Sequence, residues 1–196
     1  MSTYSKRGKQ YAAQRVSLSV IIPACGRESL RRTLESVINA GASNDDEIIV
    51  IGDGCQPTAR GICSEFRCIY EEYGPTRCYG NAQREAAIKI ASKSHLMFID
   101  DDDELGDNVM PIIKMHVLSN PQKLHLYCMR HRNFGILWKE KRIKHCNVST
   151  QMFVVPNIKS QIGHWKDKYE GDFLFIQETA KNFETIWRPE IIATQH

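Results

Sequence analysis

Short apolar runs alternate with amphipathic segments over residues 17–118 of the chain. The apolar runs predict strands at 17–22, 46–54, 67–72 and 95–99. In segments between and after these strands, apolar residues recur every three or four positions, which predicts helices at 28–41, 80–92 and 108–118. Because strands and helices that alternate along a chain form a parallel sheet with helices on its faces, this part of the chain predicts an α/β fold.

The rest of the chain is richer in strand-like segments. We expect strands at 123–129, 134–138 and 149–155 and a helix at 172–183. The sequence has no internal repeat, low-complexity segment or linker that would divide it. We therefore expect one α/β domain at 17–196, with a mostly parallel sheet flanked by helices and a β-rich, mixed second half. A basic N-terminal extension at 1–16 precedes it.

The composition is that of a globular protein, with 42% hydrophobic and 25% charged residues among 196 and a net charge of +3. Disordered, collagen-like and coiled-coil classes are therefore excluded. No apolar run approaches the ~18 residues that span a bilayer, and no apolar core follows the basic N-terminus as it would in a secretory signal. We expect a soluble protein of the cytoplasm, or of the host cytoplasm if a phage encodes it. The seven cysteines contain no C-x-x-C pair, which favours reduced, mostly buried thiols over disulfides or a zinc site.

Four consecutive aspartates, 100–103, follow the strand expected at 95–99. Neighbouring carboxylates repel by about 1 kcal/mol or less in water and by more in a cleft, so the run needs a solvated loop, a cation or raised pKa values. Ligands of open α/β sheets bind beyond the carboxyl ends of the strands. Mg²⁺ and Mn²⁺ prefer carboxylate oxygens, and Mg²⁺ is often held by one or two carboxylates together with substrate phosphates. The run therefore predicts a metal–diphosphate site, with a plain acidic loop as the alternative.

Four segments, in this order, resemble the family 2 glycosyltransferases of the GT-A fold. They are SVIIPACGRESLRRTLESVINA at 19–40, EIIVIGDG at 47–54, QREAAIKIASKSHLMFIDDDDEL at 83–105 and IGHWKDKYEGDFLFI at 162–176. The first two are similar to the family's first strand and helix and to its second strand with an acidic turn. The last two are similar to its Asp-x-Asp segment, with the family's spacing from Arg84 to Asp100, and to a later acidic segment. The resemblance implies a nucleotide-binding half at 17–105 and an acceptor half at 106–196.

Carried over onto this sequence, the resemblance implies a donor site for a nucleotide sugar, with a UDP-sugar favoured. The donor-binding residues would be Pro23, Ala24, Arg27, Glu28, Asp53, Arg84, Asp100 and Asp101. Asp100 and Asp102 would form the Asp-x-Asp motif, with Asp102 the direct ligand of Mn²⁺ or Mg²⁺. Asp172 would be the catalytic base that takes a proton from the acceptor hydroxyl, which implies an inverting reaction. The residues alone also allow a helix N-cap for Asp172 and an exposed helix position for Arg84.

The segment 130–145 combines Arg and Lys residues with Phe134 and Trp138. Such a pattern suits a phosphate backbone with a base that stacks on a ring, and it also suits a solvated hairpin over two buried rings. The candidate acceptor-binding residues are Arg130, Arg132, Trp138, Lys141 and Gln151. A hydroxymethylated DNA base, which would have to be flipped out or single-stranded, is one acceptor hypothesis. A polysaccharide or a lipid-linked glycan is the other.

Two functions of other classes remain open at this point. A nucleotidyltransferase also uses carboxylates after a strand to hold a metal and a triphosphate, but PACGRES at 23–29 is a poor glycine-rich phosphate loop. A non-catalytic nucleic-acid-binding domain would explain the basic segment but not the aspartate run. Metal-dependent hydrolysis of a UDP-sugar would exclude the binding domain, and release of pyrophosphate would favour the nucleotidyltransferase.

Overall fold

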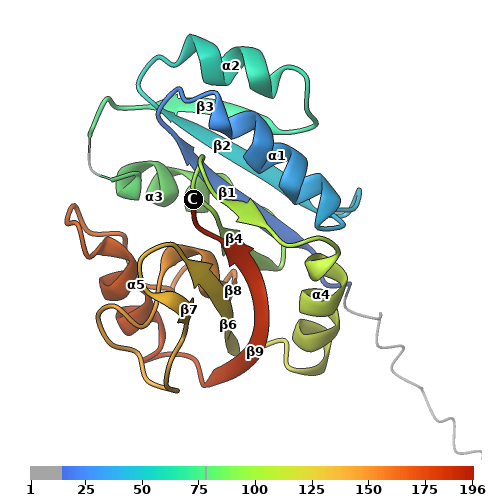
Figure 1. The fold of residues 1–196 in the computed structure, drawn as a ribbon, viewed down its shortest axis with the longest axis vertical. Coiled ribbons are helices and arrows are strands. Elements are labelled where there is room, and N and C mark those ends of the chain that lie inside the picture. Colours follow the sequence, from blue (N-terminus) through green and yellow to red (C-terminus); the bar gives the residue numbers. More distant parts are fainter. Residues whose placement is uncertain (1–14, 78) are drawn as a thin grey trace, which may run out of the picture.

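A mixed sheet runs through the computed structural model, which describes residues 15–77 and 79–196 (Figure 1). The strand order is β3-β2-β1-β4-β8-β6-β9-β5, and β7 pairs with β6 beside this path. The strands are β1 (Leu18–Ala24), β2 (Glu47–Asp53), β3 (Ile69–Tyr73), β4 (His95–Phe98), β5 (Glu104–Leu105), β6 (Leu124–His131), β7 (Gly135–Leu137), β8 (Phe153–Pro156) and β9 (Thr185–Thr194). Most of the expected basic extension at 1–16 lies outside the described residues.

The sheet changes character half-way across. Strands β3, β2, β1 and β4 pair in parallel, as the alternation of strands and helices predicts. Strand β8 is antiparallel to both β4 and β6, and β9 returns parallel to β6. The expected α/β fold with a mostly parallel first half and a mixed second half is therefore confirmed.

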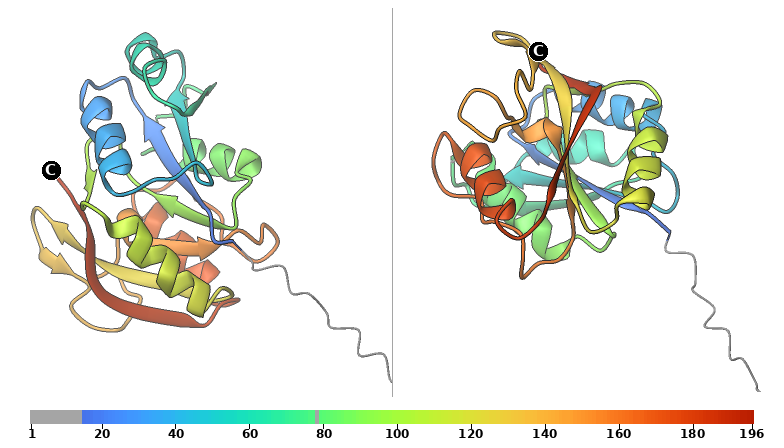
Figure 2. Two further views of the ribbon diagram at one scale, coloured as in Figure 1. Left: turned by 90° about the vertical axis from the view of Figure 1, so that its right-hand side faces the viewer. Right: turned by 90° about the horizontal axis from the view of Figure 1, so that it is seen from below.

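Helices cover both faces of the sheet. They are α1 (Ser29–Asn39), α2 (Pro57–Cys63), α3 (Asn81–Ile90), α4 (Val109–Ser119) and α5 (Gly171–Thr179). Figure 2 shows α1 and α4 on one side of the sheet and α3 and α5 on the other. Within the described part of the chain, no helix is both long and apolar enough to cross a membrane.

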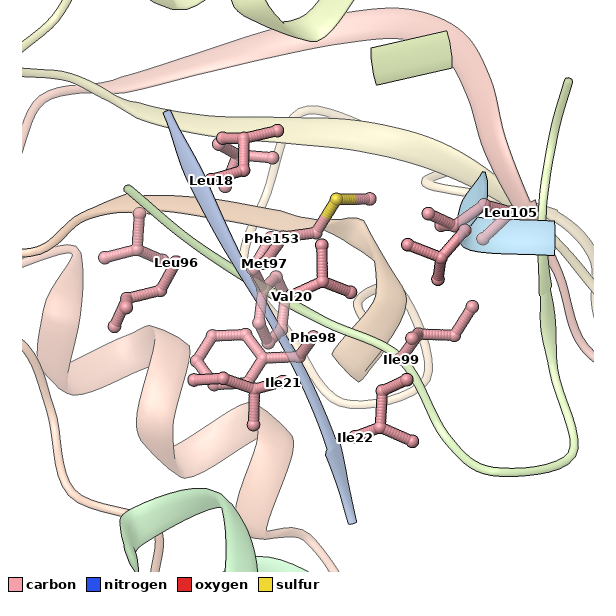
Figure 3. Close-up of a cluster of buried hydrophobic side chains, with 14 of the residues drawn as sticks. Leu18, Val20, Ile21, Ile22, Leu96, Met97, Phe98, Ile99, Leu105 and Phe153 are labelled. Atoms are coloured by element: carbon pink, nitrogen blue, oxygen red, sulfur yellow. The ribbon is translucent and has the colours of Figure 1, made fainter. Parts of the chain in front are cut away.

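The core forms around β1 and β4, which are neighbouring parallel strands in the middle of the sheet (Figure 3). All seven residues of β1 are buried, because helices cover both faces of this central strand. Phe98 of β4 lies edge-on to Trp165 and Phe175, with ring centroids 5.3 and 5.4 Å away. These contacts fix α5 and the loop before it against the end of β4, just before the aspartate run begins.

Some expectations need correction. The strand expected at 149–155 is divided into a 3₁₀ turn at Thr150–Met152 and the strand β8, and that at 134–138 shortens to β7. The interpretation of the cysteines as mostly buried is wrong for Cys25, Cys55 and Cys146, which are exposed.

Candidate active site

A cavity of about 390 Å³ opens at the carboxyl ends of β1, β2 and β4. Of the residues expected at the donor site, Pro23, Ala24, Arg27, Asp53, Arg84, Asp100, Asp101 and Asp102 all line it. Glu28 is the exception, because it is the exposed residue that precedes α1 and is not among the lining residues. The parallel strands, together with α3, thus bring residues from four distant segments to one edge of the sheet. We call this space the first cavity.

The start of α3 is held close to the end of β1. Gly80, which precedes α3, has a φ of +75°, in the left-handed region that glycine adopts without strain. A Cβ at this position would lie only 2.7 Å from Pro23, so a larger residue would force the two segments apart. Glycine at position 80 therefore lets α3 present Arg84 to the first cavity.

Arg84 is buried and contacts several groups at once. One terminal nitrogen donates to the Tyr79 carbonyl (2.9 Å) and to Asn81 Oδ1 (3.2 Å), and the other forms an ion pair with Asp100. The guanidinium carbon also lies 4.7 Å from the centroid of the Trp165 ring. The alternative that Arg84 is an exposed helix residue is therefore wrong, and its charge is fixed at the edge of the cavity.

The four aspartates point in different directions. Asp101 and Asp103 are buried, whereas Asp100 and Asp102 are more exposed to the first cavity. Asp101 Oδ2 accepts the backbone N–H of Cys25 (2.9 Å), and Asp102 forms an ion pair with Arg27. Burial, followed by repulsion from Asp100, raises the pKa of Asp103 to about 7. Burial also raises the pKa of Asp101.

Asp100 and Asp102 are the carboxylates that could hold a divalent ion beside a diphosphate. Both line the first cavity, and both offer the hard oxygen ligands that Mg²⁺ and Mn²⁺ prefer. Among the described residues, no group of three His, Cys, Asp or Glu side chains is arranged to hold a metal alone. The donor set therefore fits an ion that shares its coordination with the phosphates of a nucleotide, and does not fit a closed all-protein site.

Asp53 uses its carboxylate to order the loop between β3 and α3. Its Oδ1 accepts hydrogen bonds from the Thr76 backbone N–H (2.7 Å) and from Gln83 Nε2 (2.8 Å), and Oδ2 accepts the Arg77 N–H (3.0 Å). Because these bonds occupy both oxygens, Asp53 shapes the wall of the first cavity in this structure. Contact of Asp53 with a ribose or uracil stays a prediction.

A second cavity, also of about 390 Å³, adjoins the first. Both cavities are lined by Tyr79, Arg84, Asp100 and Gln195, so they meet at these residues. Asp172, the expected catalytic base, lines only the second cavity. Burial raises its pKa, against the smaller opposing effects of the Phe173 N–H and Arg84. A carboxylate with a raised pKa in a cavity that adjoins the first is suited to accept a proton.

Asp172 is not the N-cap of α5. The residue at that position is Glu170, and Asp172 is the second residue of the helix, where Oδ1 accepts the N–H of Phe173 (2.7 Å). Gly171 lies directly against Asn81, whose Nδ2 donates to the carbonyls of Lys166 and Lys168. The start of α3 therefore fixes both Arg84 and the turn that carries Asp172.

The residues expected to bind the acceptor do not line the second cavity. Arg130 and Lys141 are exposed, and Trp138 packs edge-on against Trp187, with centroids 5.4 Å apart. Gln151 is completely buried and donates to Asp100 (3.2 Å) and Asp103. The wall of the second cavity does include Phe134, one of the two aromatic residues noted in the basic segment, together with residues that sequence reasoning missed, namely Tyr79, His145, Ser149, Tyr169 and Gln195.

A family model described as glycosyl transferase family 2 matches residues 19–178. The chain belongs to glycosyl transferase family 2. The expected family and its GT-A fold are thereby confirmed, and the chain carries a glycosyltransferase domain. Membership disfavours the nucleotidyltransferase and the non-catalytic binding domain as alternatives.

Relatives of this family 2 domain include a poly(ribitol-phosphate) β-glucosyltransferase of Bacillus spizizenii, 28% identical over 102 residues. That alignment covers 48% of this chain but only 16% of the relative. The structure of S. aureus TarS superposes with a TM-score of 0.76 at 16% identity, covering 91% of this chain and 36% of TarS. TarS residues 1–349 in complex with UDP-GlcNAc give a TM-score of 0.75 over 92% of this chain and 58% of that one. At this identity the structures show a shared fold, and the chain spans less than two thirds of each of these proteins, from 16% to 58% of their length.

Proposed function

We propose that the chain transfers a sugar from a nucleotide sugar, with a UDP-sugar favoured, to an acceptor hydroxyl. The observation that carries this proposal is the meeting of two cavities at Arg84 and Asp100, with Asp172 in the second cavity alone. The first cavity would hold the donor and the second the acceptor. The structures of TarS residues 1–349 with UDP and with UDP-GlcNAc support this choice of donor.

The chain's own residues account for the main steps of such a transfer. The guanidinium of Arg84 is fixed at the first cavity by its ion pair with Asp100, so with a nucleotide sugar bound there it would stabilise the negative charge of the leaving diphosphate without reorganising. Asp172 would accept the proton of the acceptor hydroxyl as that oxygen attacks the anomeric carbon from the face opposite the leaving group. The reaction would therefore invert the anomeric configuration.

A divalent ion fits this scheme as a cofactor. Mn²⁺ or Mg²⁺ would be held by Asp102 and Asp100 and would neutralise charge on the diphosphate. In this structure Arg27 forms an ion pair with Asp102, and Arg84 pairs with Asp100. Two arginine side chains therefore already balance the negative charge of the two carboxylates that would bind the metal ion.

For the acceptor we propose a polymer with phosphodiester links. The cavity itself holds the carboxylates Glu170 and Asp172, which suits a neutral hydroxyl-bearing group. Arg130, Lys139 and Lys141 are exposed and lie outside the cavity lining, so they are free to contact phosphate groups of a longer acceptor chain. The relative named poly(ribitol-phosphate) β-glucosyltransferase favours a polyol-phosphate polymer.

A hydroxymethylated base in DNA is the second candidate acceptor, because the same basic segment would contact a nucleic-acid backbone. The family match is also compatible with a polysaccharide or a lipid-linked glycan, which the basic segment favours less.

The first test is a thermal-shift panel of UDP, UDP-glucose and UDP-GlcNAc with and without Mn²⁺. We expect a metal-dependent rise in melting temperature, because a ligand of the native state stabilises it. Asp102→Asn should lose this rise, and Asp172→Asn should keep it but lose transfer. Assays with poly(ribitol phosphate), hydroxymethylated DNA and an uncharged glycan then identify the acceptor. If no nucleotide changes the melting temperature of the wild type, the proposed donor site is refuted.

A further inference from the structure

Gln151 connects two of the aspartates. It is completely buried, and its Nε2 donates one hydrogen bond to Asp100 Oδ2 (3.2 Å) and another to Asp103 Oδ2. Its Oε1 accepts a hydrogen bond from Ser149 Oγ (3.0 Å). Because a hydroxyl donor fixes Oε1, the amide is oriented with its two N–H groups toward the carboxylates. All the hydrogen-bonding groups of this amide are therefore used.

The partners of Gln151 lie on two different cavities. Ser149 lines the second cavity only, whereas Asp100 lines both. Two successive hydrogen bonds, Ser149 to Gln151 and Gln151 to Asp100, therefore join the wall of the proposed acceptor site to a carboxylate of the proposed donor site. Gln151 itself lines neither cavity.

The orientation of Asp100 depends on this amide. Arg84 binds one carboxylate oxygen of Asp100 and Gln151 binds the other, so the group is held from both sides. Without the Gln151 amide, no hydrogen-bond donor would lie between the carboxylates of Asp100 and Asp103. Two carboxylates at short range in a buried site repel each other strongly. Loss of the amide would let Asp100 turn away from Asp103 and from its present place in the first cavity.

We propose that Gln151 is a positioning residue that holds the Asp100 carboxylate in the orientation needed for donor binding. Because Ser149 in the wall of the second cavity orients the Gln151 amide, the orientation of Asp100 depends on Ser149 as well. The inference rests on the proposed function. It also replaces the expectation that Gln151 contacts the acceptor directly. Replacement of Gln151 then acts on donor binding, although the side chain touches no part of the donor.

The decisive measurement is the affinity for UDP with Mn²⁺ by calorimetry, which needs no turnover. Gln151→Met keeps the length of the side chain but removes every hydrogen bond that the amide makes. It should weaken UDP binding about 10- to 100-fold, the usual effect of losing a residue that orients a metal-binding side chain. Ser149→Ala leaves the amide in place but frees its orientation, and it should weaken UDP binding roughly 3- to 10-fold. The KM for the donor should rise in both variants by more than kcat falls.

A double variant tests the connection itself. If Ser149 acts through Gln151, Ser149→Ala should add nothing further to UDP binding in the Gln151→Met background. Asn157→Leu is the matched control, because this distant amide also makes two hydrogen bonds, to the carbonyls of Ala91 and Lys93. It should lower stability without changing UDP affinity.

The outcomes separate this inference from the proposed function. A wild type that fails to bind UDP overturns both. A wild type that binds UDP, together with a folded Gln151→Met that binds it equally well, overturns the role of Gln151 alone. If Gln151→Met does not fold, Ser149→Ala decides the question, and unchanged UDP affinity and donor KM in that variant refute the inference.

Discussion

The position of Asp172 depends on the glycine that precedes it, Gly171, at the start of α5. A Cβ at Gly171 would lie 2.5–2.7 Å from three atoms of the Asn81 side chain, which is closer than real contacts allow. Asn81 cannot yield easily, because Nδ2 donates to the carbonyls of Lys166 (2.9 Å) and Lys168 (2.8 Å). Gly171→Ala should therefore push the start of α5 away from α3.

Two effects of this substitution have opposite signs. Helix propensity alone favours alanine over glycine by up to about 1 kcal/mol. Overpacking of a tight contact costs about 1–3 kcal/mol, so after the helix-propensity gain we expect a net loss of up to about 2 kcal/mol, which lowers the melting temperature by up to roughly 8 °C. A displacement of Asp172 by ~1 Å should lower kcat about 100-fold. UDP binding should change little, because Gly171 does not line the first cavity.

The assay compares thermal unfolding, UDP affinity and kcat with those of Gly61→Ala. Gly61 lies inside α2, and a Cβ there would have nothing within 4 Å, so this control should stabilise the protein by about 0.5–1 kcal/mol. A Gly171→Ala variant that is as stable as Gly61→Ala and retains full kcat would refute the packing argument and the placement of Asp172.

Three further predictions follow from single groups. Lysine cannot contact Asp100 and Trp165 at the same time as Arg84 does, so Arg84→Lys should raise the KM for the donor at least ~10-fold. Steady-state kinetics measure this, and an unchanged KM would contradict the role of Arg84. Burial raises the pKa of Asp172, and a base must be deprotonated to act, so kcat should fall on the acid side with a midpoint above the pKa of an ordinary aspartate. A pH-rate profile without this acid limb would exclude Asp172 as the base. Burial lowers the pKa of His125 to about 4, so the unfolded chain takes up its proton first as the pH falls. Stability should drop by up to about 3 kcal/mol between pH 6.5 and 4 in urea unfolding, and His125→Gln should flatten this dependence; an equal slope in both proteins would contradict it.

The fold was predictable where a completely buried strand leaves a continuous apolar run in the sequence. Strands β1 and β4 are buried along their whole length, so each appears as a continuous apolar run. Helix α2 and strand β5 were missed, because elements of seven and two residues are too short to show a period. The 3₁₀ turn at Thr150–Met152 was taken for strand because it is only three residues long and runs directly into the apolar residues of β8.

The lining of the first cavity was also predictable in large part, since parallel strands bring their carboxyl ends to one edge of the sheet. Asn81 and Gln151 could not be predicted in the same way. Asn81 acts on carbonyls 85 and 87 positions further along the chain, and Gln151 acts on carboxylates 51 and 48 positions before it. A polar residue inside a helix or turn carries no local sign of such distant partners.

The aspartate run shows how one stretch of sequence can use several solutions to charge repulsion at once. Asp100 and Asp102 are each paired with an arginine and face the first cavity. Asp101 turns inward to the backbone N–H of Cys25, and Asp103, whose pKa is raised to about 7, turns inward to Gln151. The two buried carboxylates, of which Asp101 also lines the first cavity, anchor the loop so that the two more exposed ones stay at the cavity. A plain acidic loop would have no need of buried partners, so these inward contacts argue that the run is built to hold a ligand.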